Sequence, residues 1–179
     1  MSKAADVPQT PISNRSRAVI VMGVSGSGKT TVAEHLAQRL GWAMVEGDAL
    51  HPPANVEKMR RGVPLDDADR APWLDLIGEQ LKTWASEGRS GVITCSALKH
   101  AYRARLIAAR PDLVFAYIKG SERLIGDRVA ARHHEYMPAS LLHSQFEALE
   151  EPTPDEPVIV VDASATPDAQ TQSIIAALG

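Results

Sequence analysis

The chain has 179 residues, 44% of them hydrophobic and 23% charged, which predicts one soluble globular domain. A formal net charge of −3 excludes a strongly basic surface of the kind that recruits nucleic acid or an anionic membrane. No apolar run approaches the ~20 residues of a membrane span. The single cysteine, Cys95, excludes an intrachain disulfide, and we expect a cytoplasmic protein.

Residues 1–16 differ from the rest of the chain. They are polar, contain Pro8 and Pro11, and lack the apolar stretch of a signal peptide. We therefore predict a disordered tail over residues 1–16 and a single domain over residues 17–179.

The first half of the domain predicts strands and helices in alternation. The β-branched run at 17–23 is typical of a buried strand, and 42–46 reads as a second strand. An apolar stripe every three to four residues predicts a helix over 29–40. We expect 48–71 to be irregular, with at most one helical turn near 55–60. A helix over 72–87 would then carry Pro72 in its first turn.

The second half continues the alternation. Strands are predicted at 91–95, 113–118 and 157–161, and helices at 99–109, 121–132, 138–150 and 167–178. Such a pattern favours an α/β fold of three layers around a parallel sheet of about five strands. Parallel sheets bind ligands beyond the carboxyl ends of their strands, and the motifs described next all lie at such ends.

The strongest motif is the glycine-rich loop after the first predicted strand. It matches G-x-x-x-x-G-K-[ST], whose backbone N–H groups surround phosphates, while the lysine reaches the β- and γ-phosphates. We expect this P-loop to bind ATP, with Thr30 as a ligand of Mg²⁺. The chain lacks the Asn-Lys-x-Asp motif of GTPases. The predicted nucleotide-binding residues are Gly23, Ser25, Gly26, Ser27, Gly28, Lys29, Thr30 and Thr31.

Carboxylates follow the second predicted strand. Asp48 is our candidate for accepting the proton of an attacking hydroxyl or for holding that hydroxyl in line, although an aspartate here could also cap the next segment. Glu46 could contact Mg²⁺ through water. Asn55, Asp66, Asp67 and Asp69 follow in the loop and could bind the hydroxyls of a polar substrate.

Two groups of basic residues lie near the same edge. Arg60, Arg61 and Arg70 could bind a substrate carboxylate, although each of them taken alone fits a solvated surface residue better. Lys99 and Arg103 share one face of a helix, where they could meet an anionic substrate or the transferring phosphoryl group.

The predicted helix at 121–132 carries three more arginines. Arg123, Arg128 and Arg132 could belong to a small helical lid, about 121–140, that closes over ATP and neutralises charge on its phosphates. A solvated basic face is the equal alternative. His133 and His134 lack partners at metal-ligand spacing, so we expect no zinc site.

Four segments together resemble the gluconokinase family of small P-loop kinases. They read GVSGSGKTT, GDALHPPANVEKMRRGVPLDDADRAPWL, CSALKHAYRARL and MPASLLHSQFEALEEP, in the order that the family shows. The resemblance covers about Val19 to the C-terminus. Its second block is the most specific, because shikimate kinases and adenylate kinases share the P-loop but lack that block.

This resemblance implies transfer of the γ-phosphoryl group of ATP to the 6-hydroxyl of D-gluconate, with Mg²⁺, on a nucleoside-monophosphate-kinase-like fold. Lys29, Asp48, Lys99 and Arg128 would be catalytic, and Arg123 and Arg128 would reach ATP from the lid. The residues implied around gluconate are Asp48, His51, Arg60, Arg70 and Lys99. Family members are often homodimers. This chain departs from many relatives at Glu135, where they carry a histidine.

Two alternatives stay open. The chain could be a related small-metabolite kinase with a shikimate-like or nucleotide acceptor, or a nucleotide-binding regulator with little turnover. The residues alone do not separate gluconate from other sugar acids, so that assignment rests on the resemblance.

Overall fold

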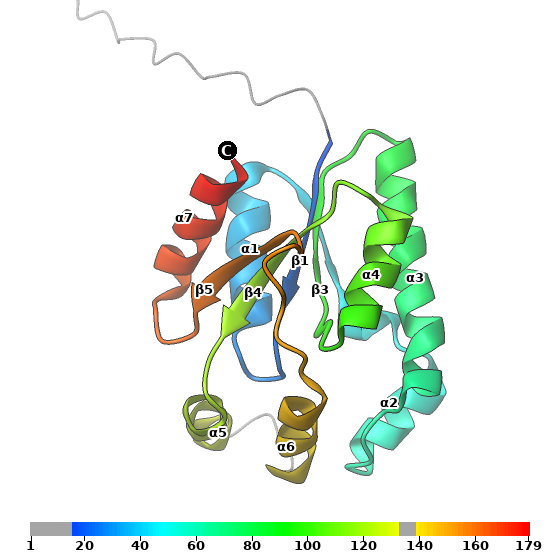
Figure 1. Ribbon diagram of the computed structural model, residues 1–179, viewed down its shortest axis with the longest axis vertical. Helices are drawn as coiled ribbons and strands as arrows, with labels where there is room; N and C mark the ends of the chain where they lie inside the picture. Colours follow the sequence, from blue (N-terminus) through cyan, green and yellow to red (C-terminus); the bar gives the residue numbers. More distant parts are fainter. Residues whose placement is uncertain (1–15, 133–138) are drawn as a thin grey trace, which may run out of the picture.

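A five-stranded parallel sheet forms the centre of the fold. The computed structural model describes residues 16–132 and 139–179, and the strand order is β2-β3-β1-β4-β5 (Figure 1). The strands are β1 (Ala18–Met22), β2 (Ala43–Glu46), β3 (Gly91–Thr94), β4 (Val114–Lys119) and β5 (Val158–Asp162). In register, Ala18 pairs with Gly91 and Val19 with Val114. The predicted α/β class and parallel sheet are confirmed.

Helices cover both faces of the sheet. Figure 1 shows α1 (Lys29–Leu40) and α7 (Pro167–Leu178) on one face and α3 (Asp67–Ser86) and α4 (His100–Ala109) on the other. Successive β1 side chains point to opposite faces, so Ile20 packs in the α3–α4 core and Val21 in the α1–α7 core. Burial on both faces explains why β1 reads as a continuous apolar run.

The remaining helices lie beyond the carboxyl ends of the strands. They are α2 (Pro53–Arg60), α5 (Glu122–Ala131) and α6 (Ala139–Ala148), and Figure 1 places them together at that edge. β1 has β3 on one side and β4 on the other, so the loop after β1 opens where the strand order reverses. Ligands of open α/β sheets bind at such a switch point.

The segment predicted to be irregular is largely helical, which corrects the sequence interpretation. A 3₁₀ turn (Gly47–Leu50) follows β2, α2 is a full helix, and α3 begins at Asp67 rather than at Pro72. Asp66 explains the early start: its side chain accepts from the backbone N–H of Asp69, and the Asp69 side chain accepts from that of Asp66. This capping box stabilises the first turn, and Pro72 lies inside the helix.

Parts of two predicted regions lie outside the described residues. These are the tail, apart from Ser16, and residues 133–138 of the lid, which include His133, His134 and Glu135. Among the residues that are described, no helix is both long and apolar enough to cross a membrane.

Candidate active site

The P-loop, residues 23–31, joins β1 to α1 at the carboxyl edge of the sheet. Gly26 and Gly28 adopt φ values of 81° and 100°, in the left-handed region that glycine tolerates best. Gly28 is the N-cap of α1, and no side chain within the described ranges caps this helix end. The first-turn N–H groups are therefore available to an anion, as a phosphate-binding loop requires.

Lys29 lies half-buried at the start of α1. Its Nζ donates a hydrogen bond to the carbonyl oxygen of Val24, 3.0 Å away. Burial lowers the pKa of Lys29, and the nearby Asp48, Cys95 and Glu46 oppose that shift. The ammonium group is thus poorly solvated, which strengthens its attraction to a phosphate.

A cleft opens beside the P-loop. It spans about 590 Å³, a volume that includes solvent at its open mouth. The P-loop contributes one wall and the segment after β2 contributes another, while α3, α6 and the turn after β3 complete it. The polar residues lining it include Ser25, Lys29, Asp48, His51, Arg70 and Gln145. Residues predicted to bind phosphate and residues predicted to bind an acceptor therefore share one space.

Asp48 presents its carboxylate to this cleft, with His51 behind it. The Asp48 side chain is 79% exposed, whereas that of His51 is only 3% exposed, and 3.8 Å separates Asp48 Oδ1 from His51 Nε2. Burial lowers the pKa of His51, and Arg70 adds to this effect against the opposing charge of Asp48. A neutral imidazole is therefore favoured next to a solvated carboxylate.

The 3₁₀ turn that carries Asp48 is fixed from three sides. Trp73 of α3 stacks on His51 with ring centroids 4.0 Å apart, and its indole Nε1 donates to Gly47 O at 2.8 Å. Asn55 Nδ2 of α2 lies 3.3 Å from His51 Nδ1. Gly47 approaches β3 so closely that an added Cβ would lie 1.9 Å from Thr94 O. Only glycine fits there, which places Asp48 at a defined point of the cleft.

Oxygen atoms suited to Mg²⁺ lie near the P-loop. Glu46 Oε2 accepts a hydrogen bond from Thr94 Oγ1 at 2.6 Å, whereas Glu46 Oε1 is buried without a hydrogen-bond partner among the described residues. A buried unpaired carboxylate oxygen usually indicates an ordered water or ion. Together with the hydroxyl of Thr30, these are the hard oxygen donors that Mg²⁺ prefers, so the residues fit the ion.

A hydrogen-bonded network joins α3 to α4 beside the cleft. Asp67 accepts from Lys99 Nζ at 2.9 Å and from the Tyr102 hydroxyl, and Arg70 Nη1 donates to that hydroxyl at 3.2 Å. The hydrogen bonds from Tyr102 and Lys99 lower the pKa of Asp67. Arg70 lines the cleft, while Lys99 lies behind it in this network.

The other polar residues of the segment hold α2 against α3. Asp69 pairs with Lys58 Nζ at 2.8 Å, and its backbone carbonyl accepts from Asn55. Asp66 and Asp69 close the capping box described above. Residues considered as contacts for substrate hydroxyls therefore already have partners within the fold, and they shape the cleft wall.

The remaining predicted cations lie outside the cleft lining. Arg60 is exposed at the end of α2, and Arg123 is exposed in the first turn of α5. Arg128 lies half-buried in the last turn of α5, where it helps Ser164 to lower the pKa of Asp162. Among the described residues, the structure thus brings Lys29, Asp48, His51 and Arg70 together but not these three arginines.

Two residues had roles that the sequence did not reveal. Gln145 of α6 reaches the P-loop, where its Oε1 accepts from Ser25 N at 2.7 Å and its Nε2 donates to Ser25 Oγ at 3.0 Å. Arg103 was predicted at the mouth of the cleft, and this is wrong: its side chain is fully buried and paired with Glu156. Both contacts join residues far apart in sequence, so no local pattern indicates them.

Comparison with known proteins places these features in a family. A family model described as an AAA domain matches residues 19–152. The chain is 50% identical over 167 residues to the gluconokinase of Gluconobacter oxydans (strain 621H), and the match covers 93% of this chain and 94% of that protein. The similarity therefore extends far beyond the P-loop.

Solved structures agree. A gluconokinase from Sinorhizobium meliloti 1021 has a TM-score of 0.84 and 42% identity, covering 90% of this chain and 91% of that chain. An unliganded sugar kinase from Janibacter sp. HTCC2649 has a TM-score of 0.87 and 44% identity, covering 91% of this chain and 94% of that chain. A P-loop, a carboxylate facing it and similarity along nearly the whole length lead to one conclusion: the chain belongs to the gluconokinase family and is a P-loop kinase that uses ATP.

Proposed function

We propose that the protein transfers the γ-phosphoryl group of ATP to the 6-hydroxyl of D-gluconate, giving 6-phosphogluconate and ADP. The observation that carries this proposal is the shared cleft, in which Lys29 of the P-loop, Asp48 and Arg70 line one space. The names of the family members support gluconate as the acceptor.

The reaction needs a nucleophile, a proton acceptor and charge neutralisation. The 6-hydroxyl oxygen attacks the γ-phosphorus, the bond from that phosphorus to the β–γ bridging oxygen breaks, and ADP leaves. Asp48 takes the hydroxyl proton, because its carboxylate is solvated and opens into the cleft. Lys29 and the P-loop N–H groups offset the negative charge that gathers on the phosphate oxygens.

His51 supports Asp48 rather than reacting itself. Its ring is held by Trp73, and its lowered pKa favours the neutral form, so no second positive charge competes for the carboxylate. Asp48 therefore stays free to bind the acceptor hydroxyl.

Arg70 is the best-placed group for the acceptor carboxylate. It lines the cleft, and its bond to Tyr102 fixes the direction of the guanidinium. Guanidinium groups bind carboxylates through paired hydrogen bonds. We propose that Lys99 attracts the same carboxylate from a greater distance and that Arg60 lies at the outer rim of the cleft.

Mg²⁺ and the lid complete the proposed site. Thr30 and Glu46 would hold Mg²⁺, and the bound ion would neutralise charge on the β- and γ-phosphates. Arg123 and Arg128, on α5 next to the P-loop, are proposed as the lid cations for ATP. A homodimer, a cytoplasmic location and a lack of nucleic-acid binding stay predictions of the sequence, and Glu135 lies outside the described residues.

The proposal is tested by following ADP release with MgATP and a panel of acceptors. The panel contains D-gluconate, shikimate, glycerate, other sugar acids and nucleoside monophosphates. We expect turnover on D-gluconate alone, lost in Asp48→Ala and retained in Asp75→Asn, which changes a carboxylate on α3 outside the cleft lining. Turnover on another acceptor would identify that molecule, and not gluconate, as the substrate. Release of ADP without any acceptor would favour a nucleotide-binding regulator.

A further inference from the structure

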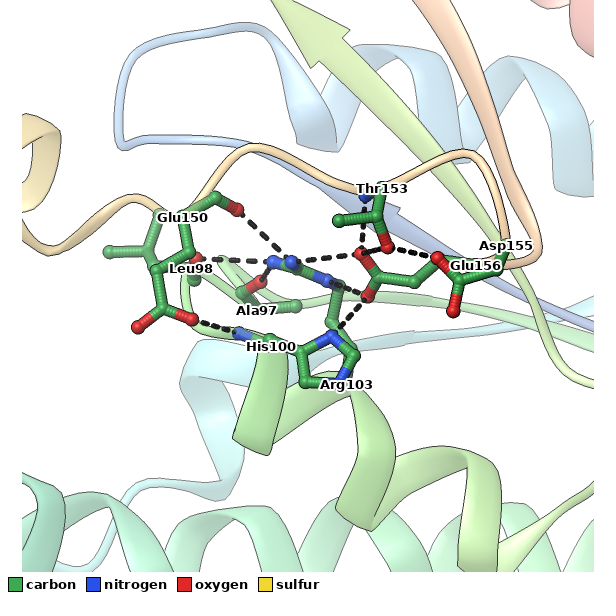
Figure 2. Close-up of polar contacts among 8 residues, drawn as sticks. All are labelled: Ala97, Leu98, His100, Arg103, Glu150, Thr153, Asp155 and Glu156. Carbon is green, nitrogen blue, oxygen red and sulfur yellow. Dashed lines mark hydrogen bonds and ion pairs between the residues drawn. The ribbon is translucent and has the colours of Figure 1, made fainter.

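A buried ion pair joins α4 to the segment between α6 and β5. Arg103 of α4 is fully buried, and Glu156, from the segment between α6 and β5, has a side chain only 4% exposed. Arg103 Nε and Nη2 donate to the two Glu156 carboxylate oxygens at 2.6 and 3.2 Å (Figure 2). Burial alone would raise the pKa of Glu156, but hydrogen bonds from Arg103 and Thr153 lower it to about 2.

The rest of the guanidinium binds backbone carbonyls. Nη1 donates to Ala97 O at 2.9 Å and to Leu98 O at 3.1 Å, and Nη2 donates to Glu150 O at 3.0 Å. With the two bonds to Glu156, five hydrogen bonds match the five N–H groups of an arginine. Figure 2 shows Arg103 between the two backbone segments that these bonds join. No other side chain type supplies this number of donors in one plane.

The first segment is the turn between β3 and α4, which reaches the active site directly. Ser96 lines the cleft, and its carbonyl accepts from the N–H of Gly23 in the P-loop at 3.3 Å. Lys99, the N-cap residue of α4, lies at the far end of the turn. Between them Ala97 has φ of 46°, a left-handed conformation that is unfavourable for a residue with a side chain. Such a turn needs outside contacts to hold its shape.

The second segment leaves α6, the helix whose Gln145 contacts the P-loop. Glu150 N donates to Leu98 O at 2.8 Å, and Glu150 Oε2 accepts from His100 N at 2.8 Å. Leu98 also packs in a small apolar cluster with Val24 of the P-loop and Leu142 of α6. The segment that follows α6 is therefore hydrogen-bonded to the turn after β3, at the site where Arg103 binds both.

We propose that Arg103, paired with Glu156, is a positioning residue for the transfer reaction: it holds the turn 96–99 against the segment that follows α6, so that Ser96 lines the cleft and Lys99 keeps its place behind it beside Asp67. This inference rests on the proposed gluconate phosphorylation. Arg103 contacts neither substrate, so its effect passes through the turn. An ion pair that only stabilised the fold would not need to donate hydrogen bonds to Ala97 O and Leu98 O of the turn and to Glu150 O, just after α6.

The test replaces the pair without leaving an unpaired buried charge. The double variant Arg103→Met with Glu156→Met fills the same volume with apolar atoms, a change that is often neutral for stability. Because Ala97 O and Glu150 O also lose the donor that Arg103 supplies, we expect a modest loss of thermal stability, and kcat/KM for gluconate per folded molecule should fall about 10- to 100-fold because the turn shifts. KM for ATP should change far less, since the P-loop amides themselves bind the phosphates.

Two controls separate positioning from stability. Replacing Arg105 and Asp75 by methionine removes an exposed pair between α4 and α3, at 2.6 Å, that involves no residue of the turn. Leu106→Ala removes buried volume from α4 and lowers stability without removing a hydrogen bond to the turn. Neither should change gluconate kcat/KM per folded molecule. An equal loss in the Leu106→Ala control would overturn the inference, as would a double methionine variant with parental kinetics.

Arg103→Lys covers the case in which the double variant does not fold. It keeps the positive charge but cannot supply five donors, so the same selective loss on gluconate is expected; unchanged kinetics would overturn the inference.

Hydrogen exchange of the backbone amides of residues 95–100 provides a readout without any substrate. Exchange should be faster in both Arg103 variants than in the controls, and unchanged exchange would count as failure. If the parent protein did not phosphorylate gluconate, the proposed function would fail, but the exchange result would still decide whether Arg103 holds the turn.

Discussion

The two walls of the cleft are built in different ways. The P-loop wall is a single continuous segment, residues 23–31, whose glycines set the backbone and whose following helix supplies N–H groups. The acceptor wall, residues 47–70, depends on side chains from α2, α3 and α4 that bind one another: Trp73 supports His51, and Asp67 joins Lys99 to Tyr102.

This difference suggests that the two walls have separate roles. A phosphate group is common to all nucleotides and can be bound by backbone amides, which any sequence with the right glycines provides. An acceptor must be distinguished from similar molecules, and discrimination needs polar side chains at fixed positions. Changes in the P-loop should therefore affect every acceptor alike, whereas changes in the acceptor wall should alter acceptor choice and acceptor affinity.

The largest expected effect comes from Lys29→Met. Removing the ammonium from a poorly solvated site should lower kcat by about 10³-fold, because this is the lysine that the P-loop motif directs at the β- and γ-phosphates. The loss should be the same for any acceptor that the parent protein uses. Steady-state kinetics check this, and a loss confined to one acceptor would contradict the division between the walls.

Asp48→Asn should have the second-largest effect on kcat. The amide keeps the shape of the carboxylate but cannot accept the proton, so kcat should fall by about 10²- to 10³-fold with KM for ATP nearly unchanged. Isothermal titration with ATP provides the control, since nucleotide affinity should persist. If Asp48→Asn kept more than half of the parental kcat, Asp48 would not be the proton acceptor.

Gly47→Ala tests how the acceptor wall is anchored. The new Cβ would lie 1.9 Å from Thr94 O, so the 3₁₀ turn must move and the free energy of unfolding should fall by about 3 kcal/mol. Gly126→Ala in α5 is the matched control. Its nearest neighbour, Leu142 Cδ2, would be 3.8 Å away, and alanine favours a helix, so that variant should be neutral or slightly more stable. Chemical denaturation distinguishes the two.

Arg70→Met should weaken acceptor binding selectively. Losing a charge-assisted contact to the acceptor carboxylate should raise KM for gluconate by about 10- to 100-fold, with KM for ATP unchanged. Arg61→Met removes an exposed arginine that pairs only loosely with Glu57, at 3.7 Å, and should have no such effect. Equal increases in both KM values for Arg70→Met would place Arg70 outside the acceptor wall.

The smallest expected effect concerns His51 and pH. Its pKa in the folded protein is lowered from 6.5 by burial, so folding disfavours its protonation. The stability associated with neutral His51 is present above pH 6.5 and is lost as the pH falls toward the folded-state pKa. Between these pH values the parent should therefore lose more stability than His51→Gln. Denaturation midpoints across that range test this, and parallel curves would contradict a neutral buried His51.

The sequence predicted the P-loop wall well because its signal is local. Lys29 is fixed by a motif, and Asp48 follows a short apolar strand, so both could be placed at the carboxyl edge before the structure was known. The strand order was not predicted, since pairing of parallel strands depends on contacts between distant segments.

The acceptor wall was harder to predict, because it too depends on contacts between distant segments. The dense charges and prolines of 48–71 favoured an irregular loop, yet the capping box of Asp66 and Asp69 and the packing of Trp73 make it helical. Gln145 contacts Ser25 across 120 residues, and Arg103 binds Glu156 across 53. A single sequence carries no pattern for such pairs, so Arg103 was misplaced at the cleft mouth.

The most direct test of the account is to identify the product. The parent protein would be incubated with MgATP and D-gluconate, and the reaction followed by ³¹P NMR. We expect one phosphate monoester per ADP, coupled to the methylene protons at carbon 6 of gluconate, and no such signal with Asp48→Asn over the same time. Inorganic phosphate in place of the ester, or an ester at another carbon, would contradict the assignment of Asp48 and the P-loop to gluconate phosphorylation.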